Sequence, residues 1–183
     1  MMKRDVKFSY WRIVAEHSDY TLGNYDRPNR VGRAEVPTEL NDLTIGQLIE
    51  LGNITEQRAY YDACRIVLNL TDKEVDKARA IDVVAFLSWL TSEVKRINEL
   101  FNKLQPTHSP NEIKAGAEKL KFGMFGLLDW YAKRMGITNH DEVLGVPWMR
   151  IYKCLQMDYE SNEFQKRYTE ILKNDVRRHS KHH

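Results

Sequence analysis

The sequence predicts a mainly α-helical fold, a helical bundle preceded by a short N-terminal β-hairpin or extended arm. Apolar residues recur at alternating intervals of four and three over residues 83–104, which is the period of one face of a long helix. Helix-start signals recur from residue 42 onward, whereas residues 6–36 mix β-branched, aromatic and turn-forming residues. We therefore divide the chain into an N-terminal extended or β arm (residues 1–36), a helical domain (37–173) and a basic C-terminal tail (174–183).

The composition bounds the class of protein. With 183 residues, 42% of them hydrophobic, the chain can build the core of one compact unit. Lys and Arg number 28 against 26 Asp and Glu, a balance that argues against a surface built wholly for nucleic acid. The charge is uneven, because both ends are basic and the middle is slightly acidic. No apolar run is long enough to cross a bilayer, and residues 1–5 lead into no signal peptide, so no membrane partner is expected.

The N-terminal segment is predicted to be extended. Residues 6–14 alternate roughly between apolar and polar residues, and residues 20–22 are the expected pairing partner after a turn at residues 17–19. Residues 31–36 indicate another short strand, ended by Pro37. Because an isolated hairpin is barely stable in water, this segment is expected to pack on the helical body or on a partner.

Short helices are predicted next, each from a named start signal. Residues 44–47 form a capping box, in which Thr44 and Gln47 satisfy each other's amides, and open a helix to about Leu51. Thr55 is predicted to cap a second helix. Residues 71–74 form another capping box. The second helix carries Tyr60, Cys64 and Val67 on one face.

The long helix predicted by the strongest periodicity follows. Its stripe consists of Val83, Leu87, Leu90, Val94, Ile97, Phe101 and Leu104. Pro106 and Pro110 end it, and residues 109–112 combine a capping box with a proline at the first helical position. A further helix carries Met124, Leu128, Tyr131 and Met135 and stops at Gly136. Residues 138–141 are predicted to cap a brief turn.

The last helix is predicted to span residues 147–173 and to carry two apolar stripes. One consists of Trp148, Tyr152, Leu155 and Tyr159, the other of Cys154, Met157, Phe164, Tyr168 and Ile171. A helix that is apolar on two flanks usually has two neighbours. Two interpretations of the second flank are open. In the first, both neighbours of the helix lie in the same domain; in the second, the flank after Ser161 docks on another subunit. The predicted partner-binding residues are Trp148, Tyr152, Tyr159, Phe164, Tyr168 and Ile171.

Motifs of catalysis or cofactor binding are missing from the sequence. It contains no phosphate loop, GxSxG, HExxH, dinucleotide fingerprint or EF-hand, so we expect no enzyme, no cofactor and no metal, although an active site assembled from distant residues stays open. His179, His182 and His183 are expected to be a solvated terminal tail, and His17, His108 and His140 lone surface residues in loops. Cys64 and Cys154 are expected to be buried, reduced thiols in a cytosolic setting.

The basic tail allows two interpretations. Arg177, Arg178 and Lys181 are candidates for contact with DNA or with an acidic protein surface, or they serve only as a solubilising end. Few phosphates can be reached by so short a run, so any DNA contact is expected to be weak and salt-dependent.

Two segments of the chain resemble each other in sequence. Residues 43–51 and 120–128 both place a leucine, a polar residue, an apolar residue and a glycine before apolar positions. The pattern is a true repeat of two helical halves or a coincidence.

Residues 36–47 read VP-x-x-L-x-D-L-T-x-G-Q at a helix entry, and in residues 145–152 through 163–164 a short loop with proline precedes an aromatic-rich amphipathic segment. Both segments resemble a family of small virion-morphogenesis proteins of tailed bacteriophages, which are described as tail-assembly-chaperone-like. Residues 25–33 and the basic tail are not part of this pattern. The resemblance implies no catalytic residues.

The resemblance implies a non-enzymatic protein that binds other phage structural proteins, acts in the host cytoplasm during assembly, and is a homo-oligomer or part of a larger assembly. A permanent virion subunit, such as a head-tail connector or ring protein that stays in the virion, is the nearest alternative. A small host-directed regulator that binds nucleic acid through the basic ends is a third.

Overall fold

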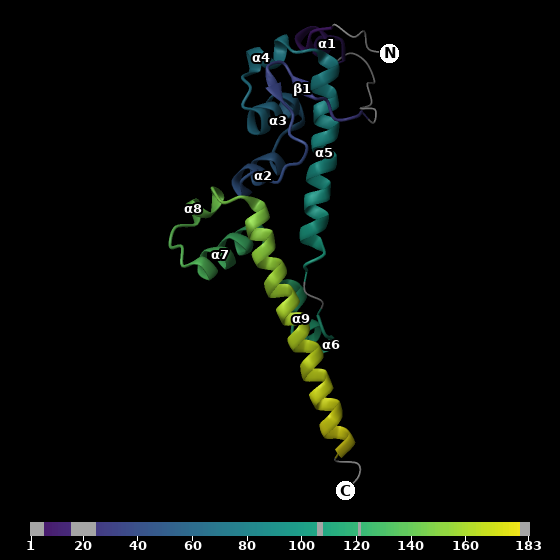
Figure 1. The fold of residues 1–183 in the computed structure, drawn as a ribbon, viewed down its shortest axis with the longest axis vertical. Helices are drawn as coiled ribbons and strands as arrows, with labels where there is room; N and C mark the ends of the chain where they lie inside the picture. Colours follow the sequence, from purple (N-terminus) through teal and green to yellow (C-terminus); the bar gives the residue numbers. More distant parts are fainter. Residues whose placement is uncertain (1–5, 16–24, 106–107, 121, 180–183) are drawn as a thin grey trace.

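The computed structural model describes residues 6–15, 25–105, 108–120 and 122–179, and it is mainly α-helical, as predicted. A body of short helices lies around the upper part of the long helix α5, and the C-terminal helix α9 runs from the body toward the opposite end of an elongated molecule (Figure 1). In chain order the elements are α1 (Phe8–Ala15), β1 (Arg30–Val31), β2 (Ala34–Glu35), α2 (Ile45–Gly52), η1 (Glu56–Arg58), α3 (Ala59–Leu68), α4 (Asp72–Lys77), α5 (Ala80–Asn102), α6 (Pro110–Lys114), η2 (Ala117–Lys119), α7 (Gly123–Met135), α8 (His140–Leu144) and α9 (Trp148–His179).

The first predicted strand is wrong, because residues 8–15 form the helix α1. Phe8 and Trp11, three positions apart, lie on one face of this helix and are buried. The Phe8 ring contacts Tyr60 and Tyr61, with centroids 5.1 and 5.7 Å away. Burial of this aromatic pair outweighs the strand preference of the segment. The predicted pairing partner, residues 20–22, lies outside the described residues.

The β-hairpin occupies residues 30–35, where a single strand was expected. Arg30 pairs with Glu35 and Val31 with Ala34 in antiparallel register. Gly32 adopts a φ of +54°, which favours glycine and reverses the chain between the two strands. The fully buried Val31 connects the hairpin to the core. The arm predicted from the sequence therefore contributes both Val31 and α1 to the packed body.

Most of the predicted helix starts are confirmed. The Gln47 amide donates to Thr44 Oγ1 at 3.1 Å, and the Thr44 amide donates to Gln47 Oε1 at 2.9 Å. The box at Ser109 is also present, with Pro110 at the first helical position. At the start of α4, the Glu74 carboxylate accepts from both the amide and the hydroxyl of Thr71. Thr55 differs, because it precedes the 3₁₀ turn η1 and its side chain makes no capping hydrogen bond.

The core follows α5, which the periodicity predicted. Val83, Leu90 and Ile97 are buried along one face of α5, and Cys64 of α3 is buried in the same cluster. Burial raises the pKa of the Cys64 thiol to about 12, so the thiol stays protonated. Both cysteines are free thiols, but only Cys64 is buried, because Cys154 on α9 is half-buried.

The start of α9 is fixed to the start of α2. The Trp148 amide donates to the Leu43 carbonyl at 3.0 Å, and the Ile45 amide donates to the Val146 carbonyl at 2.8 Å. A Cβ on Gly46 would lie 2.9 Å from the Leu144 carbonyl oxygen, so only glycine permits this close approach of α2 and α8.

The helix α9 is longer than predicted and ends at His179, six residues after the predicted end at Lys173. With 32 residues it spans about 48 Å, because an α-helix rises about 1.5 Å per residue. Most of the predicted basic tail is therefore helical. Within the described ranges, none of the helices has both the length and the apolar character needed to cross a membrane.

Candidate protein-binding surfaces

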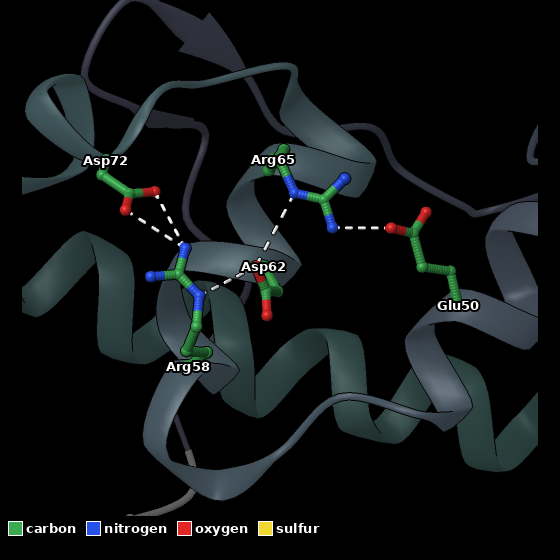
Figure 2. A network of polar contacts seen from close by, with 5 residues as sticks. All are labelled: Glu50, Arg58, Asp62, Arg65 and Asp72. Atoms are coloured by element: carbon green, nitrogen blue, oxygen red, sulfur yellow. Dashed lines mark hydrogen bonds and ion pairs between the residues drawn. The ribbon is translucent and has the colours of Figure 1, made fainter.

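The densest polar cluster joins four neighbouring elements. Figure 2 shows Arg58 and Arg65 on either side of Asp62, with Asp72 and Glu50 at the two ends. Arg58 Nη2 lies 3.1 Å from Asp72 Oδ2, and Arg65 Nη2 lies 2.6 Å from Glu50 Oε1. Both arginine side chains are about half exposed, so water and salt screen these ion pairs and each contributes little to stability. Every charge in the cluster is paired within it, so the cluster joins α2, η1, α3 and α4 and presents no free group for chemistry.

The predicted surface histidines have different surroundings. His108 is exposed, as expected, but His140 is not a lone loop residue. It is half-buried at the start of α8, with Nε2 3.3 Å from Asp129 Oδ1 and its ring 5.2 Å from the Phe125 ring. Hydrogen bonds from Lys133 and then His140 hold the pKa of Asp129 below its usual value. His17, His182 and His183 lie outside the described residues, and His179 is the last residue of α9.

No group of three or more His, Cys, Asp or Glu residues suited to a metal ion occurs in the described part of the chain.

Trp148 is a core residue, so its prediction as a partner-binding residue is wrong. It is fully buried, and its indole N–H donates to the Leu40 carbonyl at 2.7 Å. Tyr152 follows it one turn later and is half-buried, with its ring 5.6 Å from that of Phe101. Both lie on the flank of α9 that packs on the body, which the sequence pattern alone could not distinguish from an exposed flank.

Tyr159 is also half-buried and lies on the side of α9 that faces α6. It lines a hollow of about 910 Å³ together with Glu112 and Trp130. The first predicted stripe of α9 is therefore directed at neighbouring elements of the same chain along most of its length.

The other three predicted partner-binding residues form an exposed surface. Phe164, Tyr168 and Ile171 are 54%, 50% and 58% exposed. The Phe164 and Tyr168 rings stack almost in parallel, with centroids 6.1 Å apart. We use the name distal stripe for Met157, Ser161, Phe164, Tyr168 and Ile171, which at about 100° per residue fall within about 80° of arc on α9.

The distal stripe faces away from the rest of the chain. Lys166 and Lys173, which line the hollow beside α6, lie about 180–200° around the helix from Phe164. Large apolar side chains gathered on a projecting helix are typical of a protein-binding surface.

A second apolar surface, which we call the α7 groove, was missed by the sequence analysis. It is a cavity of about 790 Å³ between α5, α7 and α9, with Ile97, Phe101 and Leu155 at its base. Large side chains at its rim are strongly exposed. These rim residues are Leu120, Phe122 and Met124. The periodicity predicted α7 correctly but does not report which of its residues a neighbour covers.

The echo between residues 43–51 and 120–128 is not matched in geometry. Gly46 lies inside the first turn of α2 against Leu144, whereas Gly123 begins α7 with a φ of +56° and open space where a Cβ would stand. A Cβ on Gly126 would lie 2.5 Å from the Phe122 Cβ, so this glycine lets the chain fold tightly at the rim of the α7 groove.

The basic candidates near the C-terminus are partly described. Arg177 and Arg178 lie in the last turns of α9, where positive charge is favoured by the unpaired carbonyls, and the Arg178 side chain is exposed. Lys181 lies outside the described residues. Contact with DNA or an acidic surface stays a prediction.

Comparison with known proteins gave no match to a family model, to a curated protein or to a solved structure.

Proposed function

We propose that the chain is a non-enzymatic morphogenesis protein of a tailed phage, which binds other virion proteins in the manner of a tail-assembly chaperone in the host cytoplasm. The link to phage comes from the sequence patterns at residues 36–47 and 145–164. The binding role is supported by one structural observation above all, the two exposed apolar surfaces at the distal stripe and the α7 groove.

The side chains at these surfaces suit a chaperone. Met124 and Met157 are flexible, and Phe122 and Phe164 offer large apolar area, a combination that adapts to different partner segments. Such a protein would cover the apolar surface of a tail component until polymerisation buries that surface.

A permanent virion subunit is the second candidate, and the projecting helix α9 favours it (Figure 1). A helix of about 48 Å that leaves the body at one end is suited to holding neighbouring subunits in a ring or connector. The basic end of the same helix supports the third alternative, a nucleic-acid-binding regulator, only weakly, because so few phosphates can be contacted.

Mass spectrometry of purified phage particles, together with co-expression of the chain with each tail protein of the same genome, tests the proposal. A chaperone is absent from mature particles and keeps one tail protein soluble, and a Phe122→Ser variant loses this effect. The matched control is Ile13→Ser, at an exposed apolar residue of α1 far from both surfaces. If the chain is present in mature particles in stoichiometric amount, it is a permanent subunit. If it is retained on DNA in a salt-sensitive way, it is a regulator that binds nucleic acid.

A further inference from the structure

The distal stripe belongs to a longer seam on α9. Residues 150, 154, 157, 161, 164, 168, 171 and 175 follow one another at intervals of four and three, the spacing of a coiled-coil contact face. The seam has a positive residue, Arg150, at one end and a negative residue, Asp175, at the other, with the apolar residues between them. It extends over about 39 Å of helix.

We propose that the occupant of this seam is a second copy of the chain, whose α9 packs antiparallel to the first. The two helices cross midway between Asn162 and Glu163, so that Ser161 of each copy faces Phe164 of the other. The inference concerns self-association only and does not depend on the proposed phage function.

The surface of α9 already has a recess where the proposed register needs one. A shallow depression of about 420 Å³ lies at the small side chain of Ser161, bordered by Met157, Glu160, Phe164 and Gln165. Residues 157, 160, 161 and 164 have the spacing of the four residues that form the hole for an opposing side chain in a coiled coil. In the proposed register the second copy's Phe164 enters this depression, and its Tyr168 lies against Met157, a favourable contact of sulfur with an aromatic ring.

Charge complementarity selects the antiparallel orientation. In the proposed register Arg150 faces the second copy's Asp175, and Glu160 faces the second copy's Arg167, each pair occurring twice by symmetry. A parallel pair in register would instead place Arg150 against Arg150 and Asp175 against Asp175. Like charges opposed across an interface are destabilising, so the same sequence disfavours the parallel arrangement.

The charged residues of the seam are available for these contacts. Arg150, Arg167 and Asp175 are exposed, and none of the three has an ion-pair partner among the residues that the structure describes. The hollow beside α6 lies on the opposite side of α9, so the seam from Met157 to Asp175 faces away from it. Nearer the body, Cys154 is half-buried against the core.

Sedimentation equilibrium of the full chain tests the proposal. We expect a reversible dimer with a dissociation constant on the order of micromolar. Arg150→Glu should weaken the dimer by about tenfold or more, and the double exchange Arg150→Glu with Asp175→Arg should restore it to within about threefold. Lys173→Glu, a charge reversal on the opposite side of α9, serves as the matched control and should leave association within about twofold.

Cross-linking tests the orientation in a Cys154→Ser background. A mixture of Glu160→Cys and Arg167→Cys chains should form a mixed disulfide, whereas Asp175→Cys alone should form none, because the two copies of residue 175 lie at opposite ends of an antiparallel pair. A chain that is monomeric up to about 100 µM, a double exchange that fails to restore the dimer, or efficient Asp175→Cys cross-linking would each overturn the proposal.

Discussion

The indole N–H of Trp148 and the carbonyl oxygen of Leu40, 108 residues apart in sequence, form a buried hydrogen bond of 2.7 Å. This bond connects the first turn of α9 to the loop that precedes α2. It explains why an aromatic residue that resembles a surface anchor in the sequence is instead part of the core.

Trp148→Phe should destabilise the fold by roughly 1–3 kcal/mol, because it removes the buried indole donor and opens a small void, although the Leu40 carbonyl still accepts from the Leu43 amide at 3.2 Å. Urea unfolding measures the loss. Trp89→Phe, at a half-buried ring on the edge of the core, is the control and should cost less. Equal losses in the two variants would contradict a special role for the hydrogen bond.

Thr44→Ala should cost about 1 kcal/mol, because it removes the acceptor of the Gln47 amide at the start of α2. Thr55→Ala is a matched control, since Thr55 also precedes a helical turn but its side chain makes no capping hydrogen bond. Thermal unfolding of both variants measures the difference. A Thr55→Ala loss as large as that of Thr44→Ala would be inconsistent with the capping assignment.

Leu90→Ala should destabilise by roughly 2–5 kcal/mol, because Leu90 is only 3% exposed at the centre of α5. Leu120→Ala removes the same atoms from a side chain that is 65% exposed, so we expect a loss below about 0.5 kcal/mol. Chemical denaturation of both proteins checks the contrast, and a small loss for Leu90→Ala would place the core elsewhere.

The Glu74 carboxylate should titrate far below its usual range. Hydrogen bonds from Arg33, and then from Thr71, lower the pKa of Glu74 to about 2. Because the folded-state pKa is lowered, the contribution of Glu74 to stability is present above about pH 4.5 and is lost as the pH falls toward 2. Arg33→Ala should raise this pKa, as measured by NMR titration. The pKa of Glu112, which is lowered by Ser109, should not change in the same variant.

Phe164→Ala together with Tyr168→Ala should weaken self-association or assembly by more than about 2 kcal/mol while leaving the fold intact, because both rings are half exposed on the distal stripe. Sedimentation and thermal unfolding of the double variant separate the two effects. A large loss of thermal stability with unchanged association would mean that these rings serve the core.

The features that were predicted correctly depend on short stretches of chain. The capping boxes at Thr44 and Ser109 are each formed by residues within one four-residue segment. The seven-residue repeat of α5 indicates which face of that helix is buried. Gly136 ends α7 with a φ of +67°, as its position after a helical stripe predicted. Each of these signals has a local physical cause, so the sequence is sufficient to locate it.

The features that were missed depend on contacts between distant residues. The pattern at residues 6–14 favours a strand, and only the aromatic surroundings of Phe8 make it a helix. Trp148 and Phe164 have similar sequence settings on one amphipathic helix, yet one is buried and the other exposed. The exposure of Phe122 likewise depends on how α5, α7 and α9 are placed, which no local pattern encodes.

The unbroken helix from Trp148 to His179 also sets the direction in which its far half points. Inserting one residue near Asn162 would turn Phe164 and Tyr168 by about 100° relative to the body, whereas inserting seven residues would move them outward by about 10 Å with nearly the same bearing. The length of α9 and the direction in which its exposed face points are therefore set by different changes in sequence. A related chain can lengthen α9 by whole heptads without turning that face away from its partner.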